Sequence, residues 1–195
     1  FALLTLCFLH AVPARAQTDQ RTLNTKIADL LARIPAQNAE QNDKSMQVIA
    51  DLGAPGLEKM ATMLAAPGKG DNTALQYALA GFSYYAARPK NAALKTWSAS
   101  AYVQALKEVA DKENKAFIIR QLEIVGNDQA VPALIPYLSD ERLCDPAARA
   151  LVRINTTPAK KALLDAAQKV SGDRRLTLVE ALGDTRYSAA APVIS

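Results

Sequence analysis

Residues 122–140 read Leu-Glu-Ile-Val-Gly-Asn-Asp-Gln-Ala-Val-Pro-Ala-Leu-Ile-Pro-Tyr-Leu-Ser-Asp. Apolar residues recur at helical spacing on both sides of the Gly-Asn-Asp turn, as in Ile118, Leu122 and Val125 before it and Val131 and Leu134 after it. Strict alternation of apolar and polar residues, the pattern of a half-buried strand, is not sustained anywhere in the sequence. We therefore expect two short helices joined by a tight turn.

The same unit returns along the chain. Val125-Gly126, Ile154-Asn155 and Leu182-Gly183 stand about 29 and 28 residues apart, and an apolar second helix follows each of them. Leu52-Gly53 is an earlier copy. Two-helix units at such a period cannot bury their apolar faces alone, so they stack on one another. The sequence predicts an all-α fold, an α-α superhelix (solenoid) of about five helix pairs.

Residues at the helix ends predict where each turn lies. Asp145-Pro146 and Thr157-Pro158 each offer a side-chain acceptor at an N-cap, followed by Pro at the first helical position. Asn127 is expected to cap the helix after the turn. Three residues at helix ends tolerate the left-handed conformation: Gly126, Asn155 and Gly183. Leu134 and Leu151 lie at the centres of apolar stripes on successive helices, so we expect both to be buried.

These stretches resemble HEAT repeats, in the short variety described as PBS-lyase HEAT-like, as found in exported bacterial proteins. The likeness is carried by residues 122–140, 147–154 and 174–184. It implies an α-solenoid and says little about function. It also implies a polar ladder in which an Asp in the turn faces an Arg early in the next first helix. Asp140 and Arg175 stand in such positions, but Cys144 stands where its own repeat would carry the Arg.

The N-terminal end predicts an exported protein, periplasmic or extracellular. Residues 1–9 contain eight apolar residues, a run too short to span a bilayer, and Ala14-Arg15-Ala16 offers a signal-peptidase site before Gln17. The alternative is a hydrophobic helix docked on the domain. We expect residues 1–16 to be a partial signal peptide, residues 17–42 a helical lead-in, and residues 43–195 a HEAT-like repeat domain truncated at the C-terminus.

Residues for catalysis or metal binding are sparse in this sequence. The single His, His10, lies in the predicted signal peptide, and Cys144 has no second Cys in the predicted mature chain. This excludes His-based nucleophile pairs and Cys-rich zinc sites from residues 17–195. Gly68-Lys69-Gly70-Asp71 lacks the spacing of a phosphate-binding loop and is expected to be an inter-repeat loop. We expect no cofactor and no metal, with Cys144 serving packing.

The net charge of +4 is carried by Lys and Arg interspersed with acids, so we expect no nucleic-acid partner. The one concentration of aromatic residues offers a possible interface, although core packing is the default for such side chains. It consists of Tyr84, Tyr85, Trp97 and Tyr102.

Three functions stay open at this point. The leading hypothesis is a non-catalytic scaffold whose second helices line a concave surface that binds a protein partner or a neighbouring domain. The alternative is the N-terminal accessory region of a secreted carbohydrate-active enzyme of the 3-keto-disaccharide hydrolase type, with its catalytic domain beyond residue 195. This second resemblance is carried by residues 117–126 and 143–151. A chromophore lyase subunit has no supporting residue beyond the repeat itself.

Overall fold

A computed structural model describes residues 21–194, so the predicted signal peptide and His10 lie outside the described residues. Within this range the regular secondary structure is all helical. The α-helices are α1 (Leu23–Leu31), α2 (Ala39–Thr62), α3 (Thr73–Ala86), α4 (Ala92–Glu108), α5 (Lys112–Val125), α6 (Val131–Leu134), α7 (Cys144–Ile154), α8 (Thr157–Ala167), α9 (Asp173–Thr185) and α10 (Ala191–Ile194). Short 3-10 turns are η1 (Pro89–Asn91), η2 (Asp128–Ala130), η3 (Ile135–Ser139) and η4 (Ser188–Ala190).

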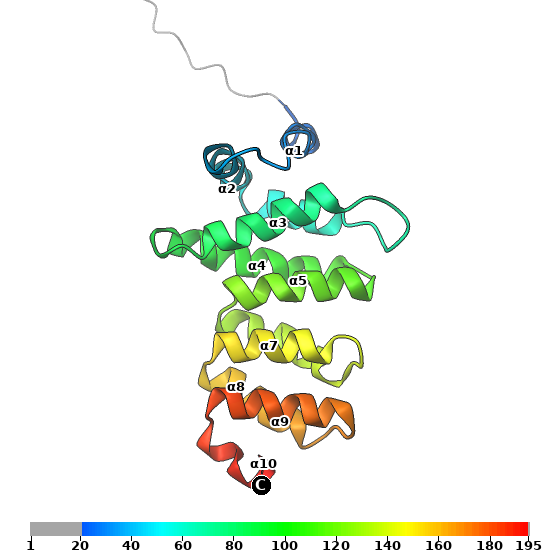
Figure 1. The fold of residues 1–195 in the computed structure, drawn as a ribbon, viewed down its shortest axis with the longest axis vertical. Helices are drawn as coiled ribbons and strands as arrows, with labels where there is room; N and C mark the ends of the chain where they lie inside the picture. Colours follow the sequence, from blue (N-terminus) through cyan, green and yellow to red (C-terminus); the bar gives the residue numbers. More distant parts are fainter. Residues whose placement is uncertain (1–20, 195) are drawn as a thin grey trace, which may run out of the picture.

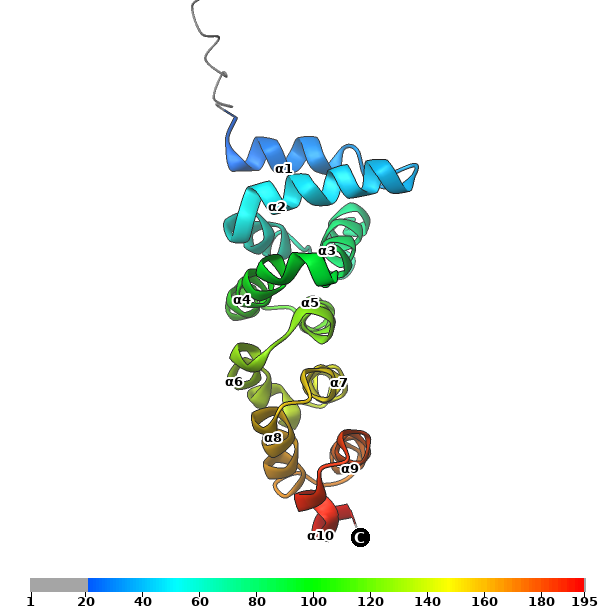
Figure 2. The same ribbon diagram turned by 90° about the vertical axis from the view of Figure 1, so that its left-hand side faces the viewer.

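The helices stack in two layers along one axis (Figures 1 and 2). Figure 2 shows the first helices of the pairs, α3, α5, α7 and α9, in one column and the second helices, α4, α6, α8 and α10, in the other. Within the first column, α5 packs on α3, α7 packs on α5, and α9 packs on α7 (Figure 1). The predicted helical solenoid is confirmed.

The core runs along the interface between the two layers. It is built mainly from Leu, Ile and Ala, and the Ala residues allow neighbouring helix backbones to approach closely. Leu134 of α6 and Leu151 of α7 are both fully buried, as predicted from their central places in the apolar stripes. The loop at 68–71 connects α2 to α3, so the inter-repeat assignment of these residues is also confirmed.

The first predicted pair is the bent helix α2. Gly53 has φ 66° and ψ −165°, a conformation that breaks the helix and that an L side chain rarely adopts. Pro55 follows and favours the start of the next helical stretch, because its missing N–H costs nothing there. The first half of α2 lies beside α1, and the second half leads into the column of second helices, where α2 packs on α4 (Figure 2).

Of the three residues predicted to stand at helix ends and to tolerate the left-handed conformation, only Asn155 adopts it, with φ 55°. Gly126 ends α5 with φ −59° instead. A Cβ atom at Gly126 would lie 2.3 Å from the carbonyl oxygen of Leu122, so glycine is needed there for close packing. Gly183 lies inside α9, and the left-handed residue that ends this helix is Arg186, with φ 51°. Gly126 therefore ends a helix as predicted, but without the left-handed conformation, whereas the prediction of a helix end at Gly183 is wrong.

Two of the predicted N-caps are also wrong. Helix α7 begins at Cys144, which puts Asp145 at the second helical position, and its turn is held instead by Asp140. The Asp140 carboxylate accepts hydrogen bonds from the backbone N–H groups of Arg142, at 2.9 Å, and Leu143, at 3.1 Å. Helix α8 begins at Thr157, so the residue at its N-cap is Thr156. Asn127 caps η2 as predicted.

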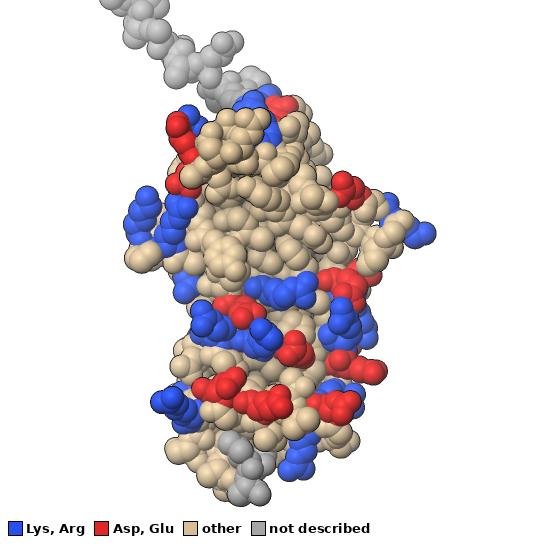
Figure 3. All heavy atoms as spheres, viewed as in Figure 1, with Lys and Arg blue, Asp and Glu red and all other residues tan. Residues whose placement is uncertain are grey.

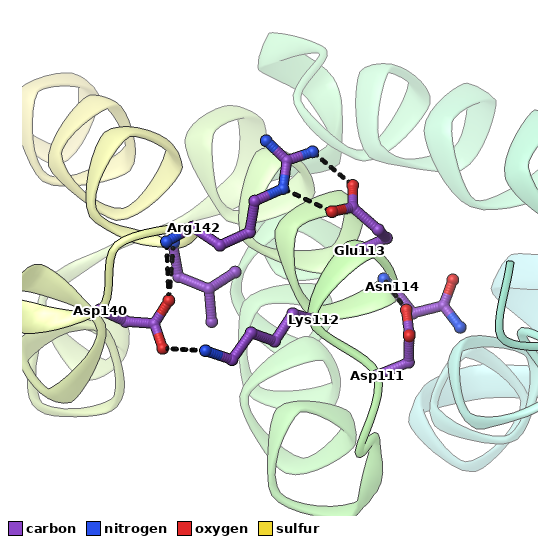
Figure 4. Close-up of polar contacts among 7 residues, drawn as sticks. Asp111, Lys112, Glu113, Asn114, Asp140 and Arg142 are labelled. Atoms are coloured by element: carbon purple, nitrogen blue, oxygen red, sulfur yellow. Dashed lines mark hydrogen bonds and ion pairs between the residues drawn. The ribbon is translucent and has the colours of Figure 1, made fainter.

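A polar ladder connects the repeat of α5 with the repeat of α7 (Figure 4). Lys112 Nζ lies 2.7 Å from Asp140 Oδ2, and the Arg142 guanidinium donates two hydrogen bonds to the Glu113 carboxylate. Hydrogen bonding by Lys112 lowers the pKa of Asp140, and hydrogen bonding by Arg142 lowers the pKa of Glu113. Asp140 thus takes part in the ladder as predicted, but its partner is Lys112 of the preceding repeat. Arg175, the other residue predicted for the ladder, forms no ion pair with any described residue.

The loop between α2 and α3 is fixed by two asparagine side chains. Asn72 accepts a hydrogen bond from Ala65 N–H and donates one to the Ala65 carbonyl oxygen. Asn114 of α5 is almost fully buried and donates to the carbonyl oxygens of Leu64 and Ala65, each at 3.0 Å. These bonds satisfy backbone groups at the end of α2 that no helix partner reaches.

Replacing Leu134 with Ala should destabilise the fold locally. Loss of a buried Leu side chain costs about 2 to 5 kcal/mol through lost burial and the cavity left behind. Because solenoid repeats contact only their neighbours, amide hydrogen exchange should accelerate in residues 113–170 more than in residues 43–66. Leu176→Ala, at an exposed position, is the control and should change exchange little. Uniform loss of protection along the chain would instead show a single cooperative core.

The two glycines that were predicted to be equivalent should respond oppositely to alanine. Gly126→Ala forces a methyl group against the Leu122 carbonyl and the Ile154 side chain, and overpacking typically costs about 1 to 3 kcal/mol. Gly183→Ala meets no atom within 4 Å inside α9 and should stabilise the protein by about 0.5 to 1 kcal/mol, since alanine is the better helix former. Chemical denaturation of both variants tests this, and equal effects would contradict the packing role of Gly126.

Candidate interaction surface

The four aromatic residues predicted as a possible interface do not share one surface. Tyr102 of α4 is fully buried, and its hydroxyl lies 3.0 Å from both Ser83 Oγ and the Leu79 carbonyl oxygen. Burial raises the pKa of Tyr102 well above its usual value. Tyr102 therefore holds α4 against α3 and offers no surface to a partner.

Tyr85 and Trp97 are half-buried and flank the core residue Phe82. The ring centroid of Phe82 lies 6.2 Å from that of Tyr85 and 5.4 Å from that of Trp97. The Tyr85 hydroxyl donates to Gln47 Oε1 of α2 at 3.0 Å, and the Arg88 guanidinium lies over the Tyr85 ring at 4.8 Å. Both aromatic rings therefore contribute mainly to the packing of α2, α3 and α4 on one another.

An ion pair connects the C-terminal end of α3 to α2. Arg88 donates two hydrogen bonds to the Asp43 carboxylate, at 2.8 and 3.0 Å, and this bonding lowers the pKa of Asp43. On the same side of α3, the Tyr77 hydroxyl donates to Asn42 Oδ1 at 3.3 Å. The hydroxyl groups of Tyr77 and Tyr85 thus both reach α2, although Tyr77 remains 37% exposed.

Among the four aromatic residues predicted as an interface, Tyr84 is the one that is largely exposed to solvent, with 67% of its surface accessible. It stands on a helix without a charged residue, and the outward positions of α3 form an uncharged stripe. The stripe consists of Thr73, Gln76, Tyr77, Ala80 and Tyr84. Figure 3 shows this part of the molecule as a broad area without Lys, Arg, Asp or Glu, above the charged rows of the later first helices.

The first helices α5, α7 and α9 present the opposite character. Their outward faces carry rows of acidic and basic side chains (Figure 3). A groove of about 320 Å³ runs between them, with a floor that includes Ala148 and Ala181. Its charged lining residues form no ion pairs within the described part of the chain: Glu123, Asp145, Arg149, Arg153, Glu180 and Asp184. Sequence reasoning missed this surface, although the charged residues at helical spacing in each first helix mark it.

Cys144 lies in the core, as expected. Only 2% of its surface is exposed, and burial raises the pKa of its thiol, with Asp145 and Asp140 adding to this shift. Both effects oppose formation of the reactive thiolate. Within residues 21–194, no group of three or more His, Cys, Asp or Glu side chains is arranged to hold a metal ion.

Among the helices within 21–194, none combines the length and hydrophobicity that a bilayer span requires.

Comparison with known proteins supports the repeat architecture. A search of curated proteins finds no match to the chain. Residues 99–183 match the family model of HEAT repeats, a range that begins within α4 and ends within α9. This range includes all three stretches on which the resemblance was based, apart from the last residue of the third. Residues 99–183 therefore resemble HEAT repeats in sequence, and the helices of the described chain outside this range stack in the same way.

Proposed function

We propose that this chain is a non-catalytic scaffold that binds a protein partner through the uncharged stripe of α3, centred on Tyr84. HEAT repeats commonly mediate protein interactions, and this fold is typically non-catalytic. The observation that carries the proposal is the exposure of Tyr84 on a charge-free helix. Cores of protein interfaces are depleted in charge and enriched in Tyr, which supplies a large contact area with few rotatable bonds.

The surroundings of the stripe supply the rim of such an interface. Interfaces typically surround an uncharged centre with polar residues that remain solvated. The Arg88–Asp43 pair stands at one end of α3, and Tyr77 and Tyr85 hold the helix against α2 through side-chain hydrogen bonds. Tyr84 is therefore presented by a rigid element, which limits the entropy lost on binding.

The proposed binding surface lies on the layer of first helices, whereas the sequence analysis favoured the second helices. Export to the periplasm or the extracellular space is part of the same proposal and rests on the N-terminal sequence alone. The role as accessory region of a carbohydrate-active enzyme stays a prediction, because no contact or surface among the described residues favours it over a protein partner.

The partner can be captured and the contact then measured. A photo-crosslinking residue in place of Tyr84, in the native host, should yield a discrete covalent adduct with a protein, and the same residue at Leu176 should not. Leu176 is the matched control because it is similarly exposed, at 60%, but lies on α9. Adducts of equal yield at both positions would indicate non-specific proximity and would contradict a surface on α3.

With the captured partner in hand, Tyr84→Ala should weaken binding at least about tenfold, the effect of losing about 1.4 kcal/mol at an interface hot spot. The free energy of unfolding should change by less than about 0.5 kcal/mol, since Tyr84 is exposed. Calorimetry of wild type, Tyr84→Ala and Leu176→Ala measures both quantities. An unchanged affinity of the Tyr84→Ala variant for the partner would show that the interface does not include this part of α3.

A further inference from the structure

The positive charge of this protein is concentrated in the helix pair α3–α4. Residues 72–107 contain four basic residues and no Asp or Glu, although the whole chain has 19 acidic residues among 195. Outside this stretch basic and acidic residues balance, at 19 each, so the formal net charge of +4 lies entirely in this one pair. Solvated protein surfaces typically mix both signs of charge, as the outward faces of α5, α7 and α9 do (Figure 3).

Three of these four basic residues lie around the turn between α3 and α4. Arg88 and Lys90 belong to the turn, Lys95 follows near the N-terminal end of α4, and Lys107 lies at the opposite end of α4. Tyr84 stands in the last turn of α3, so the basic turn follows directly after it in the chain. Figure 3 shows basic side chains at the left-hand edge of the uncharged area, on the side where Figure 1 draws this turn.

The charge of this turn is only partly neutralised within the fold. Arg88 is paired with Asp43 of α2. Hydrogen bonding by Arg88 lowers the pKa of Asp43, and the nearby charge of Lys90 adds to this shift. Lys90 and Lys95 themselves form no ion pair with any described residue. The charges of Arg88 and Asp43 cancel, which leaves Lys90 and Lys95 without a paired carboxylate.

Stabilisation of helix ends accounts for only part of this charge. A cation just after α3 is favourable, because the helix dipole is negative at the C-terminal end, and Arg88 fits this role. Lys90 and Lys95 stand at the N-terminal end of α4, where the dipole is positive and acidic side chains are preferred. Helix α4 has no acidic residue in its first turn. Packing and helix stability therefore give no reason for a cation at Lys95.

We infer that the partner bound at Tyr84 carries an acidic segment beside its uncharged contact, and that this segment lies over the turn between α3 and α4, against Lys90 and Lys95. This inference rests on the proposed function, because the uncharged stripe of α3 supplies the anchor for the partner. Opposite charges across an interface steer association and select among partners. A protein segment fits this surface better than a nucleic acid, because acidic side chains on α5, α7 and α9 would repel a phosphate backbone (Figure 3).

Calorimetric titration with three synthetic peptides tests this inference. Each peptide begins with tryptophan and leucine, to contact Tyr84, and continues with a run of glutamate, of glutamine or of lysine. We expect the glutamate peptide to bind with a Kd of about 0.1 mM, the glutamine peptide at least about tenfold more weakly, and the lysine peptide not measurably. Equal binding of the glutamate and glutamine peptides, or no saturable binding of the glutamate peptide, would overturn the inference. Oligothymidylate that binds as tightly as the glutamate peptide would also overturn it, in favour of a nucleic-acid surface.

Matched variants locate the acidic contact. Lys90→Glu should weaken binding of the glutamate peptide at least about tenfold, and Lys90→Gln, which removes the charge without reversing it, should have a smaller effect in the same direction. Lys169→Glu makes the same charge reversal on an exposed residue after α8 and should leave the affinity within about twofold. An equal effect of Lys90→Glu and Lys169→Glu would show attraction by net charge alone and would overturn the inference.

Tyr84→Ala separates this inference from the proposed function. It should weaken the glutamate peptide and abolish detectable binding of the glutamine peptide, because both peptides use the same anchor. If Tyr84→Ala weakens binding but Lys90→Glu does not, the stripe on α3 stands and the acidic segment is wrong. If only Lys90→Glu has an effect, the acidic contact stands and the anchor at Tyr84 is wrong. Thermal unfolding of each variant should match the wild type, since Tyr84, Lys90 and Lys169 are all exposed.

Discussion

Every helix of this protein has to cover its apolar stripe with the helix before it and the helix after it along the stack. The rows of Leu, Ile and Ala that meet between the two layers satisfy this requirement, and Cys144 is a free thiol that forms no disulfide within the described residues. Because each repeat contacts only its neighbours, the fold depends on the fit of each successive interface. Gly126 shows how close that fit is, since a Cβ atom there would lie 3.1 Å from the Ile154 side chain of the next repeat.

Polar contacts between successive repeats help to align them. The pairs Lys112–Asp140 and Arg142–Glu113 connect equivalent loops of adjacent repeats, and Asn114 connects α5 to the end of α2. The ion pairs are exposed, so they guide the alignment of repeats more than they stabilise it. The buried Asn114 amide differs, because removing it would leave carbonyl groups unsatisfied in the interior.

The same scaffold presents regions of different chemistry along its length. The uncharged stripe of α3 lies next to the charged faces of α5, α7 and α9 (Figure 3). In a solenoid, residues that face solvent are free of packing duties, so neighbouring repeats can differ in charge while their cores stay alike. One repetitive fold can therefore present surfaces of different chemistry along its length.

The repeat architecture was determined by the sequence itself, because apolar spacing and turn residues are local features that recur with the period. The burial of Leu134 and Leu151, and the left-handed Asn155, followed from that spacing. Only the tertiary structure decided which of Tyr84, Tyr85, Trp97 and Tyr102 faces solvent, since exposure depends on which helix covers each position. It also decided that Asp140 rather than Asp145 holds the start of α7, and that Asn114 of α5 reaches the end of α2. These contacts join residues from different helices or turns, and a local pattern contains no information on how such segments approach one another in space.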